Sequence, residues 1–334
     1  DYSEGAHEKI IQAMVRTNRE QTCGYGLDPH CENARHLIQQ AIGRKSDIHF
    51  LVGGTQANFT VISALLRPHQ GVISADTGHI NVHESGAVEA TGHKVLAIKA
   101  CDGKITAEQV EKMLTTHYTD ESYEHIVQPG MVYISHPTEL GTIYTKAELT
   151  ALRDTCAKNK IPLFLDGARL GCALAAEGTD VTLKDIAELT DIFYIGGTKM
   201  GAMFGEAVVI NNSELGKDFR YILKQHGGMM AKGRLLGIQF EELFKDGLYT
   251  ELAKHAIKCA EKIKKAMKEK GYKFAVNSPT NQIFPIIPKT KLQEIKGEFA
   301  VGFWEKHDVE NDVVRICTSW ASDEKEIELF LEKI

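Results

Sequence analysis

The sequence predicts an α/β protein with a large, mainly parallel-sheet domain and a smaller C-terminal α+β domain. From about residue 48 to 210, short apolar runs alternate with amphipathic stretches, which is typical of α/β units. Beyond residue 210 the pattern changes to long helices, followed by one strand-like run and a terminal helix. No Pro/Ser-rich linker separates the two parts, so we expect the boundary inside a long connecting helix and divide the chain into residues 1–245 and 246–334.

Five apolar runs are predicted to form the buried strands of the large sheet. They are GVISAD (71–76), HKVLAIKA (93–100), MVYISH (131–136), IPLFLD (161–166) and DIFYIGG (191–197). Two of the helices between them begin with capping boxes, Thr106 with Gln109 and Thr145 with Glu148. After the long helices, DVVRICTSW (312–320) predicts the closing strand of the second domain.

Composition narrows the class of protein. The 43% hydrophobic and 25% charged fractions are ordinary for a soluble globular enzyme, and 334 residues are enough for a substantial core. A formal net charge of −6 gives no general attraction to nucleic acid or to acidic lipid. We therefore expect a small-molecule substrate, with no nucleic-acid or membrane partner.

Cysteine usage and the amino end indicate a cytoplasmic protein. Seven cysteines make an odd count without a Cys-x-x-Cys pair, so neither a disulfide framework nor a zinc site is predicted. No apolar run approaches the roughly 18 residues that a membrane span needs. The first residues, DYSEGAHEKII, do not form a signal peptide.

A single lysine stands between two glycine-rich turns in the apolar stretch YIGGTKMGAMFGEAVVI (194–210). Removing an ammonium from water costs several kcal/mol unless the group is paired or loses its charge. One interpretation is a turn lysine that reaches solvent between two hairpin strands. The other is that Lys199 has a lowered pKa and holds an aldehyde cofactor as a Schiff base.

Asp166 ends the predicted strand IPLFLD, before the lysine turn in the chain. In an open α/β sheet the carboxyl ends of strands face the ligand crevice, so Asp166 and Lys199 are expected to meet there. A carboxylate beside the ring nitrogen of a pyridine cofactor keeps that nitrogen protonated, which lets the ring accept electrons. The alternative is an aspartate that caps the following helix.

Gly53, Gly54 and Thr55 precede an apolar-periodic helix. Free backbone N–H groups, a hydroxyl and the positive end of the helix together suit a phosphate dianion. The stretch has neither Gly-Lys-Ser/Thr nor G-x-G-x-x-G, which argues against a nucleotide as the source of that phosphate.

Two histidines and a late arginine complete the candidate site. His79 either lies flat on a cofactor ring or is a partly exposed loop histidine, and His83 follows four residues later. Metal binding by such a pair needs a regular helix, which Asn81 and the nearby glycines disfavour, so no metal is predicted. The planar fork of Arg315 suits either a substrate carboxylate or a structural ion pair.

Phosphate turn, histidine, strand-end aspartate, lysine turn and late arginine follow the chain order of the aspartate-aminotransferase-like (type I) fold of pyridoxal-phosphate enzymes. Over nearly its whole length the sequence resembles the low-specificity L-threonine and phenylserine aldolase branch of the β-eliminating lyase superfamily. DGARL followed by GGTKMGA is the most specific part of the resemblance. The matching stretches are YGLDPHCENA (25–34), GGTQAN (53–58), HINVHESGA (79–87), HPTELGTIY (136–144), DGARL (166–170), GGTKMGA (196–202), KQHGGMMAKGR (224–234) and VRICTSW (314–320).

The resemblance implies a role for each matching residue around pyridoxal 5'-phosphate. Catalysis is assigned to Lys199 as the Schiff-base lysine, Asp166 as the partner of the pyridinium nitrogen, and His79 as the residue that stacks on the ring. The remaining assignments are Gly54, Thr55 and Thr198 for the cofactor, Arg169 for its phenolic oxygen and the substrate carboxylate, and Arg315 with Ser3 for that carboxylate. The resemblance also implies a homodimer or homotetramer, in which Tyr25 and Lys224 act on a neighbouring subunit's site.

The implied reaction is retro-aldol cleavage of β-hydroxy-α-amino acids, such as threonine, allo-threonine and phenylserine, to glycine and an aldehyde. One departure concerns its base, because many threonine aldolases carry ENTH where this chain has SHPTE, with Glu139 after Thr138 and His136 displaced. The base candidates are His79, His83, Glu139 and a water relay, and we favour His79. Two alternatives stay open: a pyridoxal-phosphate enzyme that carries out β-elimination on an amino acid, and a non-catalytic protein of the same fold that binds cofactor or amino acid.

Overall fold

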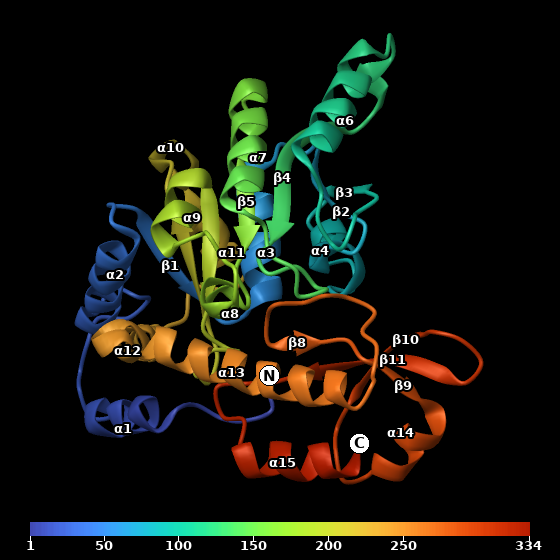
Figure 1. Cartoon of the computed structure of the whole chain (residues 1–334). Coiled ribbons are helices and arrows are strands. Elements are labelled where there is room, and N and C mark those ends of the chain that lie inside the picture. Colours follow the sequence, from blue (N-terminus) through green and yellow to red (C-terminus); the bar gives the residue numbers. More distant parts are fainter.

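A seven-stranded sheet forms the centre of the computed structural model, which describes residues 1–334 (Figure 1). Its strand order is β1-β7-β6-β5-β4-β2-β3. The contacts from β3 through β2, β4 and β5 to β6 are parallel, whereas β7 pairs antiparallel with both β6 and β1. The bounds are β1 (Asp47–Leu51), β2 (Gln70–Ala75), β3 (Lys94–Ile98), β4 (Gln128–Ser135), β5 (Leu163–Asp166), β6 (Ile192–Gly196) and β7 (Glu206–Ile210). The predicted mainly parallel α/β sheet is confirmed. Each of the five predicted runs overlaps a strand, although β2 and β4 begin before their predicted runs, at Gln70 and Gln128.

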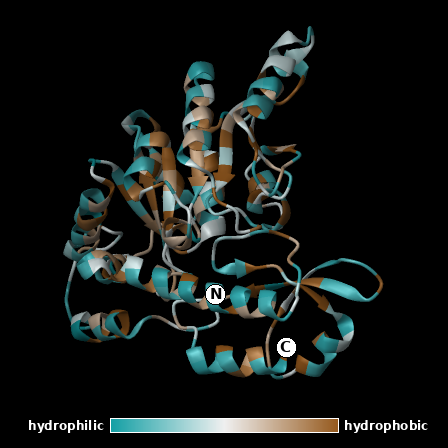
Figure 2. Cartoon of the chain, in the orientation of Figure 1, coloured by the Kyte–Doolittle hydropathy of each residue, from teal (hydrophilic) through white to brown (hydrophobic).

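Alternation along the central strands divides the core into two layers. On β6, Phe193 and Ile195 belong to the larger apolar cluster, while Ile192 and Tyr194 belong to the cluster on the other face. Successive side chains of a strand point to opposite faces, and both faces are covered here, so the strand is apolar throughout. Figure 2 shows this as a concentration of hydrophobic colour in the central strands.

The helices around the sheet begin where the sequence predicts. Both predicted capping boxes are present, at the starts of α6 (Ala107–Thr119) and α7 (Lys146–Asn159). A third, Thr182 with Asp185, starts α9 (Leu183–Leu189) and was not predicted. The other helices of this part are α1 (Glu8–Thr17), α2 (Pro29–Ile42), α3 (Gly54–Leu65), α4 (His79–Val82), α5 (Ala87–Ala90), α8 (Leu170–Ala175), α10 (Ser213–Gly216) and α11 (Phe219–Gln225). None of the helices has the length and apolar character that crossing a bilayer requires.

The predicted long connecting helix is two helices. α12 (Arg234–Phe244) and α13 (Leu248–Glu269) are separated by a short turn in which Asp246 and Gly247 have φ of 57° and 75°. These left-handed conformations interrupt helical hydrogen bonding, and Gly247 adopts its conformation without steric cost. The division at residue 245 stays a prediction.

A second, smaller sheet lies in the C-terminal part, in the order β10-β11-β8 with β9 also paired to β11, and all of its pairings are antiparallel. It packs with α13 and α15 around its own apolar cluster, which includes Ile263, Val314 and Phe330. The bounds are β8 (Gln282–Ile283), β9 (Ile286–Pro288), α14 (Lys289–Ile295), β10 (Gly302–Lys306), β11 (Asn311–Cys317) and α15 (Glu324–Lys333).

The carboxyl ends of β4 and β5 point toward this C-terminal part (Figure 1). The loop after β4 is tied to it by three hydrogen bonds: Gln282 Nε2 donates to the Thr138 carbonyl (3.3 Å), and Ser278 Oγ and Thr280 Oγ1 each donate to the Gly141 carbonyl (3.1 Å). The ends of the parallel strands therefore lie at the junction between the two sheets, where open α/β folds bind their ligands.

Candidate active site

A cavity of about 260 Å³ opens at the carboxyl ends of the strands. Its wall is formed by the start of α3, the loops after β4 and β5, and the turn between β6 and β7. Most of the residues predicted for the site line it together. They are Gly54, Thr55, His79, Glu139, Asp166, Arg169, Thr198 and Lys199.

Lys199 lies in the turn between β6 and β7, with its side chain in the cavity wall. Its ammonium makes no hydrogen bond or ion pair with the protein, and the ring of Tyr2 lies 5.9 Å from Nζ. Burial and the charge of Arg169 lower the pKa of Lys199 to about 8, against the opposing carboxylates of Asp166 and Glu206. An amine with a pKa near neutrality reacts with carbonyl compounds far more readily than a solvated lysine.

Asp166 accepts four hydrogen bonds at the end of β5. The donors are Tyr194 Oη (2.5 Å) and the Ala168 N–H (3.0 Å) to one oxygen, and Tyr133 Oη (2.6 Å) and Asn58 Nδ2 (3.0 Å) to the other. Burial alone raises the pKa of Asp166, but the charge of His79 and the two tyrosine hydroxyls outweigh it and hold the pKa below its usual value. The N-cap of α8 is Arg169, so the helix-cap alternative for Asp166 is wrong.

His79 is joined to Asp166 through two buried side chains. Asn58 Nδ2 donates to Asp166 and also to Glu84 Oε1 (2.8 Å), which in turn lies 2.7 Å from His79 Nδ1. A carboxylate only accepts hydrogen bonds, so it fixes the proton on Nδ1 and leaves Nε2 as the acceptor. Burial lowers the pKa of His79, but Glu84 and Asp166 more than reverse this and the pKa is raised.

The three side-chain candidates for the base lie in different places. Glu139 Oε1 accepts from the His79 backbone N–H (2.9 Å) and from Ser135 Oγ (2.6 Å), and burial raises the pKa of Glu139. His83 is exposed and does not line the cavity, and burial together with the charges of His79 and Arg315 lowers its pKa. His79 and Glu139 are therefore the candidates inside the cavity. The displaced His136 is fully buried outside it.

The predicted carboxylate-binding residues are only partly brought together. Arg169 lines the cavity, with Nε and Nη2 donating to the Asp1 carboxylate (2.6 and 3.1 Å). Arg315, on β11, is outside the lining, and its guanidinium lies 5.3 Å from the centre of the Trp304 ring. Ser3 is exposed and forms no side-chain hydrogen bond.

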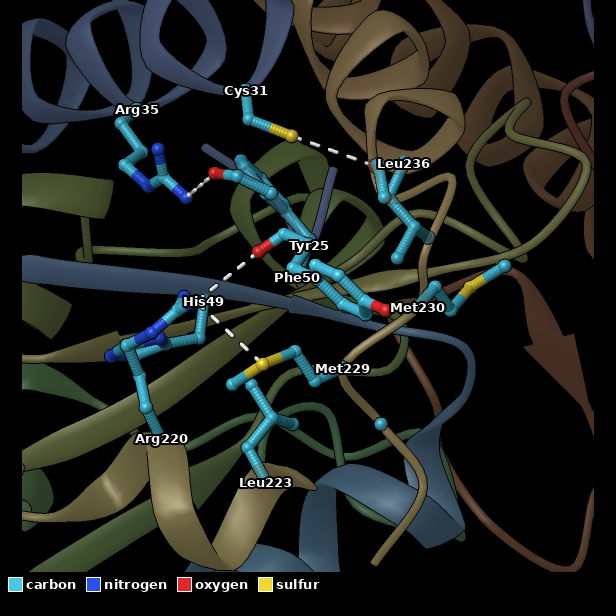
Figure 3. A pocket seen from close by; sticks show the side chains of 13 residues that line it. Tyr25, Cys31, Arg35, His49, Phe50, Arg220, Leu223, Met229, Met230 and Leu236 are labelled. Atoms are coloured by element: carbon cyan, nitrogen blue, oxygen red, sulfur yellow. Dashed lines mark hydrogen bonds between the residues drawn. The ribbon is translucent and has the colours of Figure 1, made fainter. Parts of the chain in front are cut away.

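Tyr25 and Lys224 lie away from the cavity, in a shallow hollow that they share with Tyr221 and Met229. Lys224 Nζ is 4.8 Å from the centre of the Tyr25 ring. Figure 3 shows Tyr25 beside Arg220, which donates to the Tyr25 carbonyl (3.3 Å). Neither Tyr25 nor Lys224 lines the Lys199 cavity of its own chain.

Comparison with known proteins identifies the family. The family model for beta-eliminating lyases matches residues 2–289, which is most of the chain. The chain belongs to the β-eliminating lyase family. A solved structure described as a threonine aldolase of Leishmania major matches this chain with 46% sequence identity and a TM-score of 0.96. The match covers 99% of this chain and 96% of the chain in that structure.

Curated relatives of this β-eliminating lyase include two low-specificity L-threonine aldolases. The one from Pseudomonas aeruginosa is 31% identical over 74% of this chain and 71% of its own length, and that from Pseudomonas sp. is 28% identical over 94% and 90%. An aspartate aminotransferase of Thermus thermophilus, at 16% identity and a TM-score of 0.72, covers all of this chain and 88% of its own. The predicted aspartate-aminotransferase-like fold is therefore confirmed.

The cavity of this β-eliminating lyase fits pyridoxal 5'-phosphate. Helix α3 has no side-chain cap, and the N–H groups of Gly54, Thr55 and Gln56 donate to no protein acceptor, which leaves a phosphate cradle. A Cβ at Gly54 would lie 3.0 Å from the Tyr194 hydroxyl, so the cradle has little room for a side chain there. An ionised strand-end carboxylate and an unpaired lysine complete the set of groups that this cofactor requires.

Five buried polar residues in or behind the cavity wall are not predicted as site residues by the sequence, and two of them, Tyr194 and Glu206, line the cavity. Two carry chemistry: Glu84 orients His79, and Glu206 lines the cavity beside the lysine turn. An acid in an otherwise apolar stretch, as in GEAVVI, is the signal that could have found Glu206. The other three, Asn58, Tyr133 and Tyr194, donate to Asp166.

Proposed function

We propose that this protein is a pyridoxal-phosphate-dependent aldehyde-lyase that cleaves β-hydroxy-α-amino acids, including threonine, allo-threonine and phenylserine, to glycine and an aldehyde. The observation that carries the proposal is that one cavity holds an unpaired lysine with a lowered pKa, Lys199, and a carboxylate held ionised by four donors, Asp166. The resemblance to threonine aldolases supplies the substrate class.

Bound pyridoxal phosphate would act as a sink for the electron pair that is released when a bond to the substrate Cα breaks. Lys199 Nζ would hold the cofactor covalently, and the free N–H groups of Gly54 and Thr55, with the Thr55 hydroxyl, would bind its phosphate. Asp166 would keep the ring nitrogen protonated, because its charge is fixed by buried donors rather than by solvent. Thr198 would contact the cofactor from the lysine turn.

His79 is proposed as the base for the β-hydroxyl. Its Nδ1 proton is committed to Glu84, so Nε2 is the nitrogen left to accept a proton. Glu139 is the second candidate, but its Oε1 already accepts hydrogen bonds from the His79 N–H and from Ser135 Oγ. The proton would move from the substrate hydroxyl to Nε2 as the Cα–Cβ bond breaks.

The choice of bond at Cα depends on how the substrate carboxylate is held. Arg169 and Arg315 are proposed to bind it, with Ser3 from the amino-terminal arm, and to keep Cα–Cβ perpendicular to the ring. Nη1 of Arg169 forms no hydrogen bond with the protein, which leaves a donor for this contact. The guanidinium of Arg315 makes no hydrogen bond at all and has its full fork available.

The proposal includes a homodimer or homotetramer in the cytoplasm. Lys224 and Tyr25 lie outside their own chain's cavity on an exposed face, where a second copy could present its site to them. A cytoplasmic location agrees with seven cysteines of which none is paired.

Product analysis tests the proposed reaction. The purified enzyme, supplied with pyridoxal phosphate, is incubated separately with L-threonine, L-allo-threonine and phenylserine, and with Lys199→Ala as the control. We expect glycine with acetaldehyde or benzaldehyde in equal amounts, and no product from the control. Oxo acid with ammonia would instead support β-elimination. A protein that binds the cofactor but turns over none of the three would support the non-catalytic alternative.

A further inference from the structure

Glu206 is a buried acid at a position where an apolar residue would be expected. It is the first residue of β7, is 4% exposed, and is followed in the strand by Ala207, Val208, Val209 and Ile210, which are all buried. No lysine, arginine or histidine lies within ion-pair distance of its carboxyl group. Burying a carboxyl without an ionic partner costs several kcal/mol, so its presence in the cavity wall needs a reason.

The carboxyl of Glu206 is bonded to the two residues that precede Lys199. Its Oε2 accepts from the Gly197 N–H (3.2 Å), and its Oε1 accepts from Thr198 Oγ1 (2.9 Å). Thr198 Oγ1 also accepts from the Gly205 N–H (3.0 Å), at the other end of the turn. The carboxyl therefore joins the start and the end of the turn that carries Lys199.

The charges of Glu206 and Lys199 act on each other across the cavity wall. The carboxylate of Glu206 raises the pKa of Lys199, against burial, which lowers it most. Burial raises the pKa of Glu206, whereas the Thr198 hydroxyl and the positive charge of Lys199 lower it, so the two groups titrate together. The other titratable groups that interact electrostatically with Lys199 or Glu206 are the Asp1 amino group, His79, Asp166, Arg169, Cys172, Tyr194, Tyr249 and Cys317.

We propose that Glu206 is a positioning residue for Lys199: its carboxyl holds the lysine turn closed, and its negative charge favours the protonated form of Lys199 Nζ. This inference rests on the proposed function of Lys199 as the cofactor-binding residue. Glu206 would then be a second carboxylate of the site, next to the lysine turn, whereas Asp166 is proposed to pair with the ring nitrogen of the cofactor. Each protonation is a simple exchange, in which Nζ gains one proton from solvent and its lone pair becomes an N–H bond.

The test is a spectrophotometric pH titration of the holoenzyme, in which the absorbance of the Lys199–cofactor linkage reports protonation of Nζ. Glu206→Gln removes the charge while both contacts can be kept, with the amide oxygen accepting from the Gly197 N–H and the amide NH₂ donating to Thr198 Oγ1. We therefore expect the midpoint to move to lower pH by about one unit. Glu206→Asp keeps the charge on a shorter side chain, and its midpoint should stay closer to that of the wild type than the glutamine variant's does.

Asp191→Asn is the matched control, because Asp191 is a buried carboxylate that pairs with Arg153 outside the cavity. It should lower the melting temperature without moving the midpoint. A Glu206→Gln midpoint equal to the wild type's would overturn the inference. So would a wild-type-like glutamine variant beside a shifted aspartate variant, because only bond geometry would then matter. If Glu206→Gln does not fold, an aspartate variant displaced by a full unit or more contradicts the inference, and an unshifted one supports it.

Borohydride reduction of the same wild-type sample separates this inference from the proposed function. A reduced adduct on Lys199 with an unmoved Glu206→Gln midpoint defeats only the role of Glu206. Absence of an adduct on Lys199 in the wild type defeats the assignment of the lysine itself, whatever the midpoint of the variant.

Discussion

The cavity wall and the outlying cationic residues are held in opposite ways. Asp166 accepts four hydrogen bonds from its own chain, and His79 is bonded through both its ring and its backbone. Arg315 and Lys224 make no side-chain hydrogen bond, and each lies over an aromatic ring, Trp304 or Tyr25. The groups proposed to act on the cofactor are thus held in place by partners within a single chain. The donors of Arg315 and Lys224 stay free to bind a substrate or a second subunit.

This difference predicts which substitutions affect chemistry and which affect binding. Groups that are pre-oriented by buried partners stabilise developing charge without reorganising, so their loss lowers turnover. Substituting a cation that contacts only an aromatic ring should cost the protein little stability. We expect the effect of such a substitution to be a lower kcat/KM.

Asp166→Ala is expected to have the largest effect, a fall in kcat on the order of 10²-fold or more. The cofactor should still bind, because the phosphate cradle at Gly54 and Thr55 is unchanged. Turnover and cofactor absorbance are measured on one preparation, with Asp191→Ala as a buried carboxylate control outside the cavity. Near-normal turnover in the Asp166 variant would remove it from the catalytic machinery.

Arg315→Lys should lower kcat/KM by roughly 10- to 100-fold, because a charge-assisted hydrogen bond contributes about 1.5–3 kcal/mol and lysine lacks the second prong. The melting temperature and cofactor absorbance should barely change. Arg153→Lys is the contrasting control, since Arg153 pairs with Asp191 away from the cavity and its loss should lower the melting temperature while the kinetics hold. Unchanged kinetics on phenylserine would take Arg315 out of the site.

Glu84→Gln should cost about 10-fold in kcat/KM, near the lower limit of what a charge-assisted hydrogen bond contributes. The carboxylate of Glu84 raises the pKa of His79, so its replacement should also move the acidic limb of the pH–rate profile to lower pH. The measurement is kcat/KM from pH 5 to 9. A reduced rate with an unmoved acidic limb would show that Glu84 acts only by packing.

His136 should affect stability alone, since it lies outside the cavity. Its Nδ1 accepts from the Tyr144 N–H (3.3 Å), and burial lowers its pKa to about 4. The unfolded chain takes up the proton first, near pH 6.5, so the stability from the neutral ring is complete above pH 6.5 and is lost as the pH falls toward 4, by on the order of 3 kcal/mol. Thermal melts from pH 7.5 to 4.5 should show a smaller decline in His136→Gln. Parallel declines in the two proteins would contradict this.

The sequence predicts the residues that line the cavity better than the residues that hold them in place through hydrogen bonds. The sequence predicts that Lys199 and Asp166 lie together, because both follow buried parallel strands and such strand ends share one edge of a sheet. For Tyr133 and Tyr194 the sequence predicts only a place in a strand, because a strand pattern does not show which side chains face a distant aspartate. Their partnership depends on the packing of three neighbouring strands.

For the candidate residues that do not line the cavity, sequence patterns predict the residue itself but not the side chains that it contacts. Arg315 was found on its predicted strand, yet its contact with Trp304 depends on how β10 and β11 pair. Tyr25 and Lys224 are far apart in sequence and meet on an exposed face. Their partners in the proposed oligomer are set by the surface of a second copy, which the sequence pattern of one chain does not encode locally.

The central claim is that Lys199 is the residue that binds the cofactor, and peptide mapping after borohydride reduction of the holoenzyme tests it most directly. Reduction makes the linkage permanent, and mass spectrometry of the digest then locates the pyridoxyl group. The account predicts one labelled site, Lys199, and no label in Lys199→Ala. A label on Lys224 or on any other lysine, or a label that persists in the alanine variant, would contradict it.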